Sequence, residues 1–405
     1  MDSGSPMTAN TGKLAEDDLR QTHARGISDQ VRVAVACSGL GHIQRGVEAW
    51  AQDLGRALKD AGANITIYGN GNDENVIPIP CLRRTSTGAI WLARALRSFG
   101  GWHYGLGSAY EVEQATFALA LWPQMCRSID IVHVQDPVLA AYFEWAHRRG
   151  LCRAKVIYAN GTNEGAKTMR EFAYLQCLTA ASFEAWKLQK PPKQKIFMIP
   201  NFIDTAVFSP GDRRQAREAL GLPLDRHILL CCAAIRRHHK RIDYLISEFA
   251  AALAEAHCDA MLVIAGARES DTDELIEYGK ALLGDKIHFL QNVPRDQMPY
   301  LYRAADIFTL ASLHEMFGIV LLEAMATGLP IICNDSQEFH AIVGPAGYYC
   351  DLSSKGSLAK AVIHLLEDGT RALLEGEARR HVEAYFSVKA VLPQILQMYL
   401  SVLSE

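Results

Sequence analysis

Short apolar runs that alternate with helical segments are the feature of this sequence that most restricts its fold. The first run, residues 31–37, ends in a glycine-containing loop, and a helical stretch from about residue 47 to residue 61 follows. The same order recurs after the runs at 65–69, 129–134 and 155–159. Such alternation is typical of parallel strands whose sheet is covered by helices. The sequence therefore predicts an α/β fold.

A second series of the same kind begins after a break that contains Pro210 and Gly211. Its expected strands are residues 227–234, 260–265, 286–290, 307–310 and 330–333. At 405 residues with 49% hydrophobic content, the chain is long enough to bury two cores. We therefore predict two Rossmann-like, doubly wound parallel-sheet domains that face a central cleft, where ligands bind outside the carboxyl ends of the strands.

The expected domain boundaries follow from the position of this break. Residues 31–205 form the expected N-terminal domain and residues 206–385 the expected C-terminal domain, with a last helix in residues 386–405. Residues 1–30 are polar, rich in Ser, Thr, Gly and Asp, and show little periodicity. We expect this N-terminal segment to be disordered.

Composition and charge exclude several kinds of partner. The net charge of -4 provides no broad basic field, so the sequence does not predict nucleic-acid binding. The ten cysteines show no Cys-x-x-Cys spacing and no secretory segment precedes them, which favours reduced thiols in a cytoplasmic protein over a zinc site. No uncharged apolar window approaches the roughly 18 residues that span a bilayer.

Residues 312–330 contain the most informative local pattern. From Ile319 the sequence is apolar and compatible with a helix, which Gly328 and Pro330 would end. The first backbone N–H groups of a helix lack intrahelical partners, and the helix dipole favours negative charge there. We therefore predict that a phosphate docks at the start of this helix, against Met316, Phe317, Gly318 and Ile319.

Two carboxylates flank this predicted phosphate site. Glu323 lies about 7.5 Å along the helix axis, at ~1.5 Å per residue, which suits a carboxylate that accepts both hydroxyls of a ribose. Glu315 precedes the helix, on the side where a sugar would lie. The alternative is a buried leucine-rich helix with a surface glutamate at each end, although packing alone does not require this spacing.

The segment from Glu315 to Glu323 resembles the Glu-x-Phe-Gly-x-x-x-x-Glu signature of the retaining GT-B glycosyltransferases of family 4, the glycosyl transferases group 1. The resemblance extends over almost the whole chain beyond residue 30. It implies the GT-B fold, with an acceptor domain at 31–205 and a nucleotide-sugar donor domain at 206–385. It also implies that the C-terminal helix, 386–405, packs back toward the first domain.

A basic cluster follows the expected strand that ends near Ala234, so it lies at a carboxyl edge of the sheet. It is similar to the family segment Gly-Arg-Leu-x-x-x-Lys-Gly-x-Asp-x-Leu, and Lys240 matches the family lysine directly. The family arginine would fall on Ile235, so Arg236 or Arg237 would have to supply that charge. These cations would neutralise a departing diphosphate. The alternative is a solvated basic turn.

Three further donor-binding positions come from the resemblance. Residues 45–48 resemble the Gly-Gly-Val-Glu turn of the family, which implies that Gly46 approaches the donor phosphates. Gly266 follows an expected strand and would let the chain pass close to the nucleotide. The loop that contains Val293 would hydrogen-bond the base through its main chain.

Residues 133–136 end an expected strand at the cleft and resemble the His-x-His-(Asp/Glu) segment of the family. Gln135 stands where relatives have the second histidine, which contacts the transferred sugar. His133 is either a catalytic residue or a buried histidine whose hydrogen bonds are satisfied. Asp136 is expected to receive or orient the acceptor hydroxyl.

No cofactor and no metal are expected. Asp271 and Asp273 match an Asp-x-Asp metal motif only superficially, because they stand at the start of a helical run, where acidic residues cap the helix and complement its dipole. Lys240, a neighbouring arginine and the start of the helix at Ile319 would meet the charge of the leaving diphosphate. The reaction is therefore expected to be metal-independent.

Arginines and apolar residues alternate at helical spacing in residues 90–99. Such a helix rests on an anionic membrane surface, lines an acceptor groove, or is an ordinary domain helix with extended arginine side chains. Peripheral contact with a membrane stays open as an alternative for a protein otherwise expected in the cytoplasm.

The patterns and the resemblance imply a retaining glycosyltransferase. It would move a sugar from a nucleotide diphosphate donor, UDP-sugar in preference to GDP-sugar, to a hydroxyl of a glycan, lipid or small molecule. The alternative is a non-catalytic nucleotide-sugar-binding partner subunit, which Gln135 and the displaced arginine motivate. A nicotinamide-dependent oxidoreductase is disfavoured, because the loop with Gly39, Gly41 and Gly46 lacks the dinucleotide spacing and the second strand lacks its acidic residue. The oligomeric state is not predicted.

Overall fold

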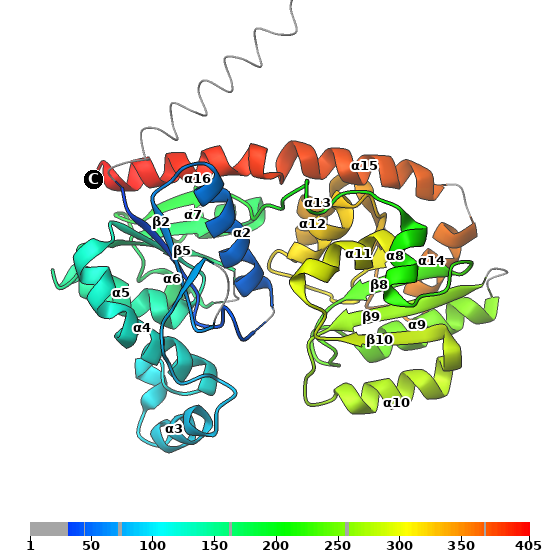
Figure 1. Cartoon of the computed structure of the whole chain (residues 1–405), viewed down its shortest axis with the longest axis horizontal. Helices are drawn as coiled ribbons and strands as arrows, with labels where there is room; N and C mark the ends of the chain where they lie inside the picture. The colour runs from blue at the N-terminus through cyan, green and yellow to red at the C-terminus, as the bar shows by residue number, and fades with distance from the viewer. Residues whose placement is uncertain (1–30, 44, 72–74, 162–163, 256–258, 368–369) are drawn as a thin grey trace, which may run out of the picture.

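The computed structural model describes residues 31–43, 45–71, 75–161, 164–255, 259–367 and 370–405. The segment 1–30, which the sequence predicts to be disordered, lies outside the described residues. The chain forms two α/β domains, each built on one parallel sheet, and they lie side by side beneath a pair of C-terminal helices (Figure 1).

The first sheet has seven parallel strands in the order β3-β2-β1-β4-β5-β6-β7. Its strands are β1 (Val33–Ala36), β2 (Ile65–Gly69), β3 (Val76–Pro78), β4 (Ile131–Val134), β5 (Lys155–Ala159), β6 (Tyr174–Cys177) and β7 (Lys195–Met198). Its helices are α2 (Gly46–Asp60), α3 (Thr87–Arg97), η1 (Gly101–Tyr104), α4 (Ala109–Ser128), α5 (Pro137–Arg148), α6 (Ala166–Met169) and α7 (Ala180–Lys187). The central strands β1 and β4 are wholly buried, as expected for a sheet covered on both faces.

The second sheet has six parallel strands in the order β10-β9-β8-β11-β12-β13. Its strands are β8 (His227–Cys232), β9 (Ala260–Gly266), β10 (Ile287–Gln291), β11 (Ile307–Thr309), β12 (Ile331–Asn334) and β13 (Gly347–Cys350). Its helices are α8 (Arg213–Leu220), α9 (Ile242–Glu255), α10 (Thr272–Leu283), α11 (Met298–Ala304), α12 (Ile319–Ala326), α13 (Gln337–Val343) and α14 (Ser357–Glu367). In each sheet the strand order reverses beside the first strand of the domain, β1 or β8, which is the doubly wound arrangement.

The prediction of two doubly wound parallel-sheet domains is confirmed. Every expected strand coincides with an observed one, and the ends differ by at most about two residues. The sequence analysis missed β3, β6, β7 and β13. Three of these are edge strands whose residues are only partly buried, so they need less apolar sequence than the central strands, several of which are equally short.

The linker between the sheets is anchored at both ends. Phe208 is buried and packs edge-on against Tyr302 of the second domain, with ring centres 5.9 Å apart. Asp212 caps α8, because its carboxylate accepts a hydrogen bond of 3.1 Å from the backbone N–H of Gln215. The proline and glycine therefore lie in a short segment that is held at both ends.

The last two helices span both domains (Figure 1). α15 (Thr370–Tyr385) packs on α12 of the second domain, and α16 (Val388–Leu403) packs on α2 of the first. The hydroxyl of the buried Tyr399 lies 2.8 Å from Nδ1 of His133 on β4. Lys155 on β5 donates a hydrogen bond of 2.8 Å to the carbonyl of Val402. The end of the chain therefore completes the first domain.

His133 lies in this packed interior. Its second ring nitrogen, Nε2, is 2.8 Å from Oε1 of Gln176, so both nitrogens are engaged. Complete burial lowers the pKa of His133 to about 3. Of the two alternatives for this residue, the geometry fits the buried, satisfied histidine, because a neutral ring enclosed on all sides exchanges no proton with a substrate.

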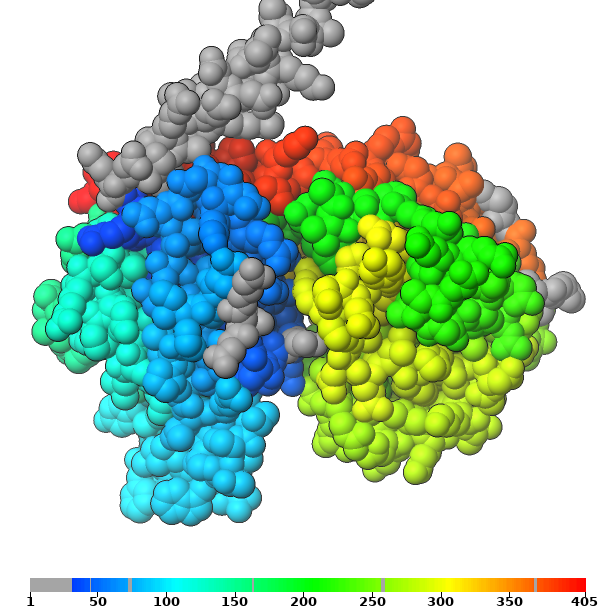
Figure 2. Space-filling model, viewed as in Figure 1, coloured from blue at the N-terminus to red at the C-terminus, as the bar shows by residue number. Residues whose placement is uncertain are grey.

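A groove separates the two domains on the side away from α16 (Figure 2). Two charged pairs link its walls. Nη2 of Arg45 lies 2.6 Å from Oε1 of Glu269, and Nη2 of Arg295 lies 2.8 Å from Oδ2 of Asp53. Arg45 and Asp53 belong to the first domain, and their partners Glu269 and Arg295 belong to the second.

The burial of neutral His133 predicts a loss of stability in acid. The ordinary pKa of 6.5 applies to the unfolded chain, and the folded value is about 3, so between these pH values the unfolded state binds one more proton. The free energy of unfolding should therefore fall by about 1.4 kcal/mol per pH unit below about 6.5 from this group alone.

His133→Gln tests this expectation, because glutamine keeps hydrogen-bonding groups but does not titrate. Urea denaturation at several pH values between about 7 and about 5 should give a shallower decline for the variant. Equal slopes in the two proteins would show that the histidine is not held neutral.

Candidate functional site

The helix start that the sequence predicted is present. α12 begins at Ile319, and Gly318 just before it has φ 70° and ψ 67°, in the left-handed region where a side chain is strained. A Cβ at this position would also lie 3.1 Å from Cδ1 of Leu321. Phe317 is buried and packs edge-on against Phe386, with ring centres 5.9 Å apart. Gly318 and Phe317 together fix the direction in which the chain enters α12. The neighbouring Met316 is half-buried.

Glu323 lies inside α12 and is almost completely buried. The hydroxyl of Tyr302 donates a hydrogen bond of 2.6 Å to its Oε2, and Nη1 of Arg295 pairs with its Oε1. Charge-assisted hydrogen bonds of this kind hold the carboxylate in one orientation. Glu323 is therefore a fixed acceptor, and each of its two oxygens already has a partner in the second domain.

Arg295 connects this carboxylate to the other domain. Its Nη2 lies 2.8 Å from Oδ2 of Asp53 on α2, and its guanidinium carbon lies 4.9 Å from the ring centre of Phe208. Burial by itself lowers the pKa of Arg295, but the nearby carboxylates of Glu323 and Asp53 have the larger effect, so the pKa is raised. Sequence reasoning missed Arg295, Asp53 and Tyr302. Only the proximity of Arg295 to the loop after β10, already expected at the nucleotide base, pointed to it.

Lys240 and Glu315 meet although they are far apart in the chain. Nζ of Lys240 pairs with Oε1 of Glu315, and both side chains are largely buried. The residues on either side of Lys240 have unusual backbone angles, with φ 69° at His239 and φ 50° at Arg241. Non-glycine residues with positive φ cluster at functional loops, where the surrounding structure maintains the strain. Arg241 supplies part of that restraint by donating a hydrogen bond of 2.7 Å to the carbonyl of Leu352.

The two candidate arginines differ in how far their donors are used. Arg237 is tied to α10, because its Nη1 lies 2.8 Å from Oε2 of Glu274 and its backbone N–H donates to Asp271 at 2.7 Å. Nε of Arg236 is buried and has no hydrogen-bond partner among the described residues. A buried donor without a partner is costly. Arg236 is therefore the better candidate for a ligand contact.

The three other expected donor positions have different surroundings. Gly266 ends β9, where a Cβ would lie 1.7 Å from the carbonyl oxygen of Ala233, so the glycine is needed for the close approach of two chain segments. This is a physical reason other than the expected approach to a nucleotide. Val293 is half-buried in the loop after β10, and Gly46 is the first residue of α2 with open space around its Cα.

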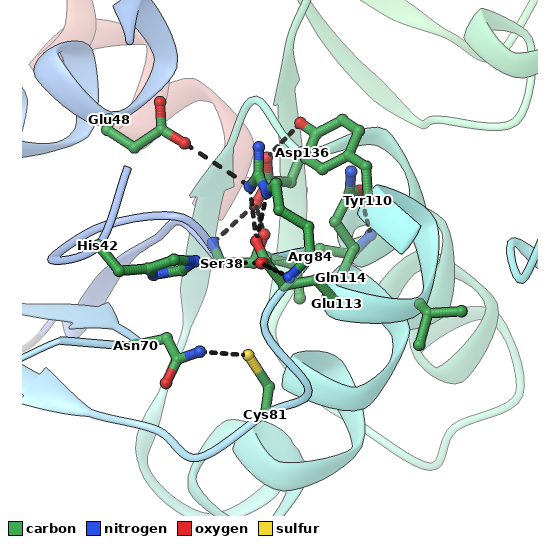
Figure 3. Close-up of polar contacts among 12 residues, drawn as sticks. Ser38, His42, Glu48, Asn70, Cys81, Arg84, Tyr110, Glu113, Gln114 and Asp136 are labelled. Atoms are coloured by element: carbon green, nitrogen blue, oxygen red, sulfur yellow. Dashed lines mark hydrogen bonds and ion pairs between the residues drawn. The ribbon is translucent and has the colours of Figure 1, made fainter. Parts of the chain in front are cut away.

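Asp136 follows β4 and is almost completely buried (Figure 3). Its Oδ2 accepts hydrogen bonds from the backbone N–H and the hydroxyl of Ser38, at 2.7 and 2.8 Å, and its Oδ1 accepts one of 2.9 Å from the hydroxyl of Tyr110. Burial raises the pKa of Asp136, and the hydrogen bonds from Ser38 oppose that rise. The carboxylate is thus held rigidly at the carboxyl ends of β1 and β4.

A second charged group adjoins Asp136 (Figure 3). Nη2 of Arg84 lies 2.6 Å from Oε1 of Glu113 and 3.7 Å from Oε1 of Glu48, and its guanidinium carbon lies 4.2 Å from the ring centre of Tyr110. Nε2 of His42 is 3.1 Å from the other oxygen of Glu113. Burial raises the pKa of Glu48. The sequence analysis did not identify Arg84 or Glu113 as functional.

This first-domain cluster has unused hydrogen-bonding capacity. Three of its buried polar atoms have no partner among the described residues, namely Nδ1 of His42, Oε2 of Glu48 and Nε2 of Gln114. Buried polar atoms in native proteins are nearly always paired with protein, water or ligand. A cluster that combines free donors and acceptors is chemically suited to a ligand rich in hydroxyl groups.

The acidic pair considered as a metal motif is engaged elsewhere. Asp271 occupies the position before α10, but its carboxylate accepts from the backbone N–H of Arg237 and makes no cap bond to α10, contrary to expectation. Asp273 pairs with Arg268. Within the described part of the chain, no group of three or more His, Cys, Asp or Glu residues is arranged to hold a metal ion. Among the same residues, no helix has the length and apolar character needed to cross a membrane.

The charged link between the domains predicts a measurable coupling. Arg295→Gln should destabilise the protein by about 2 kcal/mol, because it leaves two carboxylates without their counter-charge. Asp53→Asn alone should cost less, and the two changes together should be less damaging than the sum, with a coupling of about 1 to 2 kcal/mol in urea denaturation.

Arg226→Gln is the matched control for this cycle, since Arg226 pairs with exposed Asp259 and Asp285 on the surface. It should leave the free energy of unfolding almost unchanged, because exposed ion pairs contribute little to stability. Additive effects of the Asp53 and Arg295 substitutions would show that the two domains are not linked there.

Comparison with known proteins agrees with this geometry. Residues 212–384 match the family model described as glycosyl transferases group 1. The chain is 29% identical over 225 residues to N-acetyl-alpha-D-glucosaminyl L-malate synthase of Bacillus anthracis, covering 55% of this chain and 58% of that protein. It is 34% identical over 224 residues to D-inositol 3-phosphate glycosyltransferase of Salinispora arenicola, covering 51% and 49%. The chain thus spans about half the length of these curated relatives.

Solved structures resemble nearly the whole chain. Sucrose-phosphate synthase from Thermosynechococcus elongatus superimposes with a TM-score of 0.70 at 19% identity, over 93% of this chain and 100% of that one. Anabaena Alr3699/HepE, in complex with UDP and glucose, superimposes with a TM-score of 0.69 at 16% identity, over 92% and 100%. At this identity the likeness establishes the fold. The chain therefore has the two-domain GT-B fold, and its residues 212–384 form a glycosyl transferases group 1 domain.

Proposed function

We propose that the protein is a retaining, metal-independent glycosyltransferase that moves a sugar from a nucleotide diphosphate donor to an acceptor hydroxyl, with a UDP-sugar favoured over a GDP-sugar. The observation that carries the proposal is the meeting of Lys240 and Glu315 beside the start of α12, within the segment that matches glycosyl transferases group 1. The relatives with this domain have names of glycosyltransferases, which supports the assignment.

Each part of the donor has a chemically suitable partner in this proposal. The start of α12 receives a phosphate, because its first N–H groups and the helix dipole favour an anion. Glu323 accepts the ribose hydroxyls from an orientation that Tyr302 and Arg295 hold. Glu315, with the main chain from Phe317 to Ile319, orients the transferred sugar.

Lys240 and Arg236 stabilise the leaving diphosphate. Glu315 balances the charge of Lys240, and a diphosphate offers the lysine a further anionic partner. The unused Nε of Arg236 supplies a donor that no other described group requires. Fixed positive groups that face developing negative charge lower the barrier to bond cleavage.

The chemical step breaks the bond between the anomeric carbon and the diphosphate oxygen, and the acceptor oxygen forms a new bond to the same face of that carbon. The acceptor proton goes to the leaving phosphate oxygen. Asp136 already accepts hydrogen bonds from Ser38 and Tyr110, which suits it to orient the acceptor side of the groove more than to remove a proton.

The second candidate function is a non-catalytic nucleotide-sugar-binding subunit. Gln135 motivates it, since the side chain is buried and points its Nε2 to Oδ1 of Asn201 at 3.5 Å. Slow hydrolysis of a nucleotide sugar by the purified chain would favour the enzyme, because a binding subunit leaves the donor intact. Thermal-shift measurements with uridine, guanosine and adenosine diphosphate sugars would identify the base.

The role of Glu323 predicts the effect of its removal. Glu323→Ala should weaken nucleotide binding at least about tenfold in calorimetry, because two charge-assisted hydrogen bonds to the ribose are lost. Glu323→Gln keeps the volume and should also weaken binding. Glu248→Gln is the control, since Glu248 is equally buried in the same domain but holds the backbone N–H of Gly356 at 2.7 Å. Unchanged affinity in Glu323→Ala would contradict the ribose assignment.

The role of Lys240 predicts a different kinetic signature. Lys240→Ala should lower kcat by about 100-fold or more with a smaller change in KM, because the lysine acts most strongly on charge that develops as the diphosphate leaves. Lys280→Ala on the exposed face of α10 should leave both constants unchanged. An unchanged kcat in Lys240→Ala would show that the lysine does not take part in the chemical step.

A further inference from the structure

The α3–η1 segment, residues 79–110, projects from the first domain. In Figure 1 it lies at the end of that domain farthest from α16, and Figure 2 shows the same part as a protrusion beside the groove. Its own core is small. It contains Ala89 and Ala93 together with Val112 of α4, and Leu92, Leu106 and Ala109 pack around them. The inner face of α3 is therefore satisfied, and its other side faces solvent.

Large aromatic side chains are concentrated on this projection. Trp91 is 70% exposed, Phe99 85%, Trp102 60% and Tyr104 70%, and Ile90 is 47% exposed. Monomeric soluble proteins rarely gather so many large exposed apolar side chains in one place, and such gatherings mark interaction sites. The exposed aromatic residues make the outer face of this segment a candidate interaction surface.

The charge of the segment identifies the kind of partner. Residues 75–110 contain no Asp or Glu, although the whole chain has a net charge of -4. Arg94 and Arg97 are exposed on α3 and make no ion pair with any described residue. They follow Ile90 and Trp91 at spacings of three to seven residues, so apolar and cationic side chains share one outer face. This face is complementary to a surface that is anionic and apolar just below.

We propose that the α3–η1 segment docks on the surface of a bilayer that contains anionic phospholipid. Tryptophan and tyrosine prefer the interfacial layer of a membrane, where the ring is apolar on one side and hydrated on the other. Arginine extends its guanidinium to lipid phosphates while its stem lies among apolar groups. A convex projection reaches a flat bilayer without a matching cavity, which a protein partner would have to provide.

Docking on a bilayer is a separate property from the proposed catalytic function. Binding to a bilayer is measured without donor or acceptor, whereas nucleotide binding is measured without lipid. If the chain binds vesicles but no nucleotide sugar, the docking surface is supported and the proposed enzyme is contradicted. If it binds a nucleotide sugar but no vesicles, the enzyme is supported and the docking surface is contradicted.

The test is flotation of the full chain with vesicles of phosphatidylcholine, with and without phosphatidylglycerol. We expect binding only to the vesicles with phosphatidylglycerol, weakened by salt because part of the attraction is electrostatic. Each of Arg94→Gln and Arg97→Gln should lower the affinity about fivefold, and the pair about 25-fold. Trp91→Ser with Trp102→Ser should abolish both the binding and a blue shift of tryptophan fluorescence on contact with lipid.

Trp145→Ser is the matched control. Trp145 is also an exposed tryptophan of the first domain, 49% exposed, and the guanidinium carbon of Arg149 lies 4.4 Å from its ring centre. It should bind vesicles as the unmodified chain does. Unchanged circular dichroism would establish that the variants are folded. The proposal is overturned if the chain ignores phosphatidylglycerol, if Trp145→Ser loses binding as fully as the double tryptophan variant, or if the tryptophans instead mediate self-association.

Discussion

All strands in both sheets run parallel, so in each domain their carboxyl ends meet at one edge. This constraint brings distant segments together. Lys240 follows β8 and meets Glu315, which follows β11, and Ser38 follows β1 and meets Asp136, which follows β4. Parallel strands also require crossover helices, whose starts lie at the same edge. The hydrogen-bonded parallel strands therefore set where the site residues lie, and the loops after the strands carry those residues.

The buried charged groups near the groove compensate one another in pairs. A buried charge is tolerated when an opposite charge and hydrogen bonds compensate for its lost hydration. Glu315 does this for Lys240, and Arg295 does it for both Glu323 and Asp53. Arg295 pairs with both Glu323 and Asp53. A ligand that changes the hydrogen bonding of Glu323 therefore also affects the ion pair between Arg295 and Asp53, which joins the two domains. The outer face of α3 follows the opposite rule, since its arginines are left unpaired in water.

Much of the fold and part of the site were predictable from the sequence. The helix expected from about residue 47 to residue 61 is α2, Gly46–Asp60, whereas β3 and β13 lie at the sheet edges and were not recognised. The spacing of Glu315, Gly318 and Glu323 predicted a helix start between two carboxylates. Tyr302 was not predictable, and the only signal for Arg295 was its place beside the loop after β10, because both residues matter through what they contact.

The sequence by itself determined the α/β class, the start of α12, and the acid-free composition of residues 75–110. Only the tertiary structure decided that Arg236 keeps a buried donor without a partner while Arg237 pairs with Glu274, that His133 lies in the core, and that Arg295 ties Glu323 to the other domain. The physical reason is the sequence distance over which each kind of interaction acts. Helix and strand signals arise from neighbours within a few residues, but the burial and the partner of a polar side chain depend on segments that meet only when the domains pack.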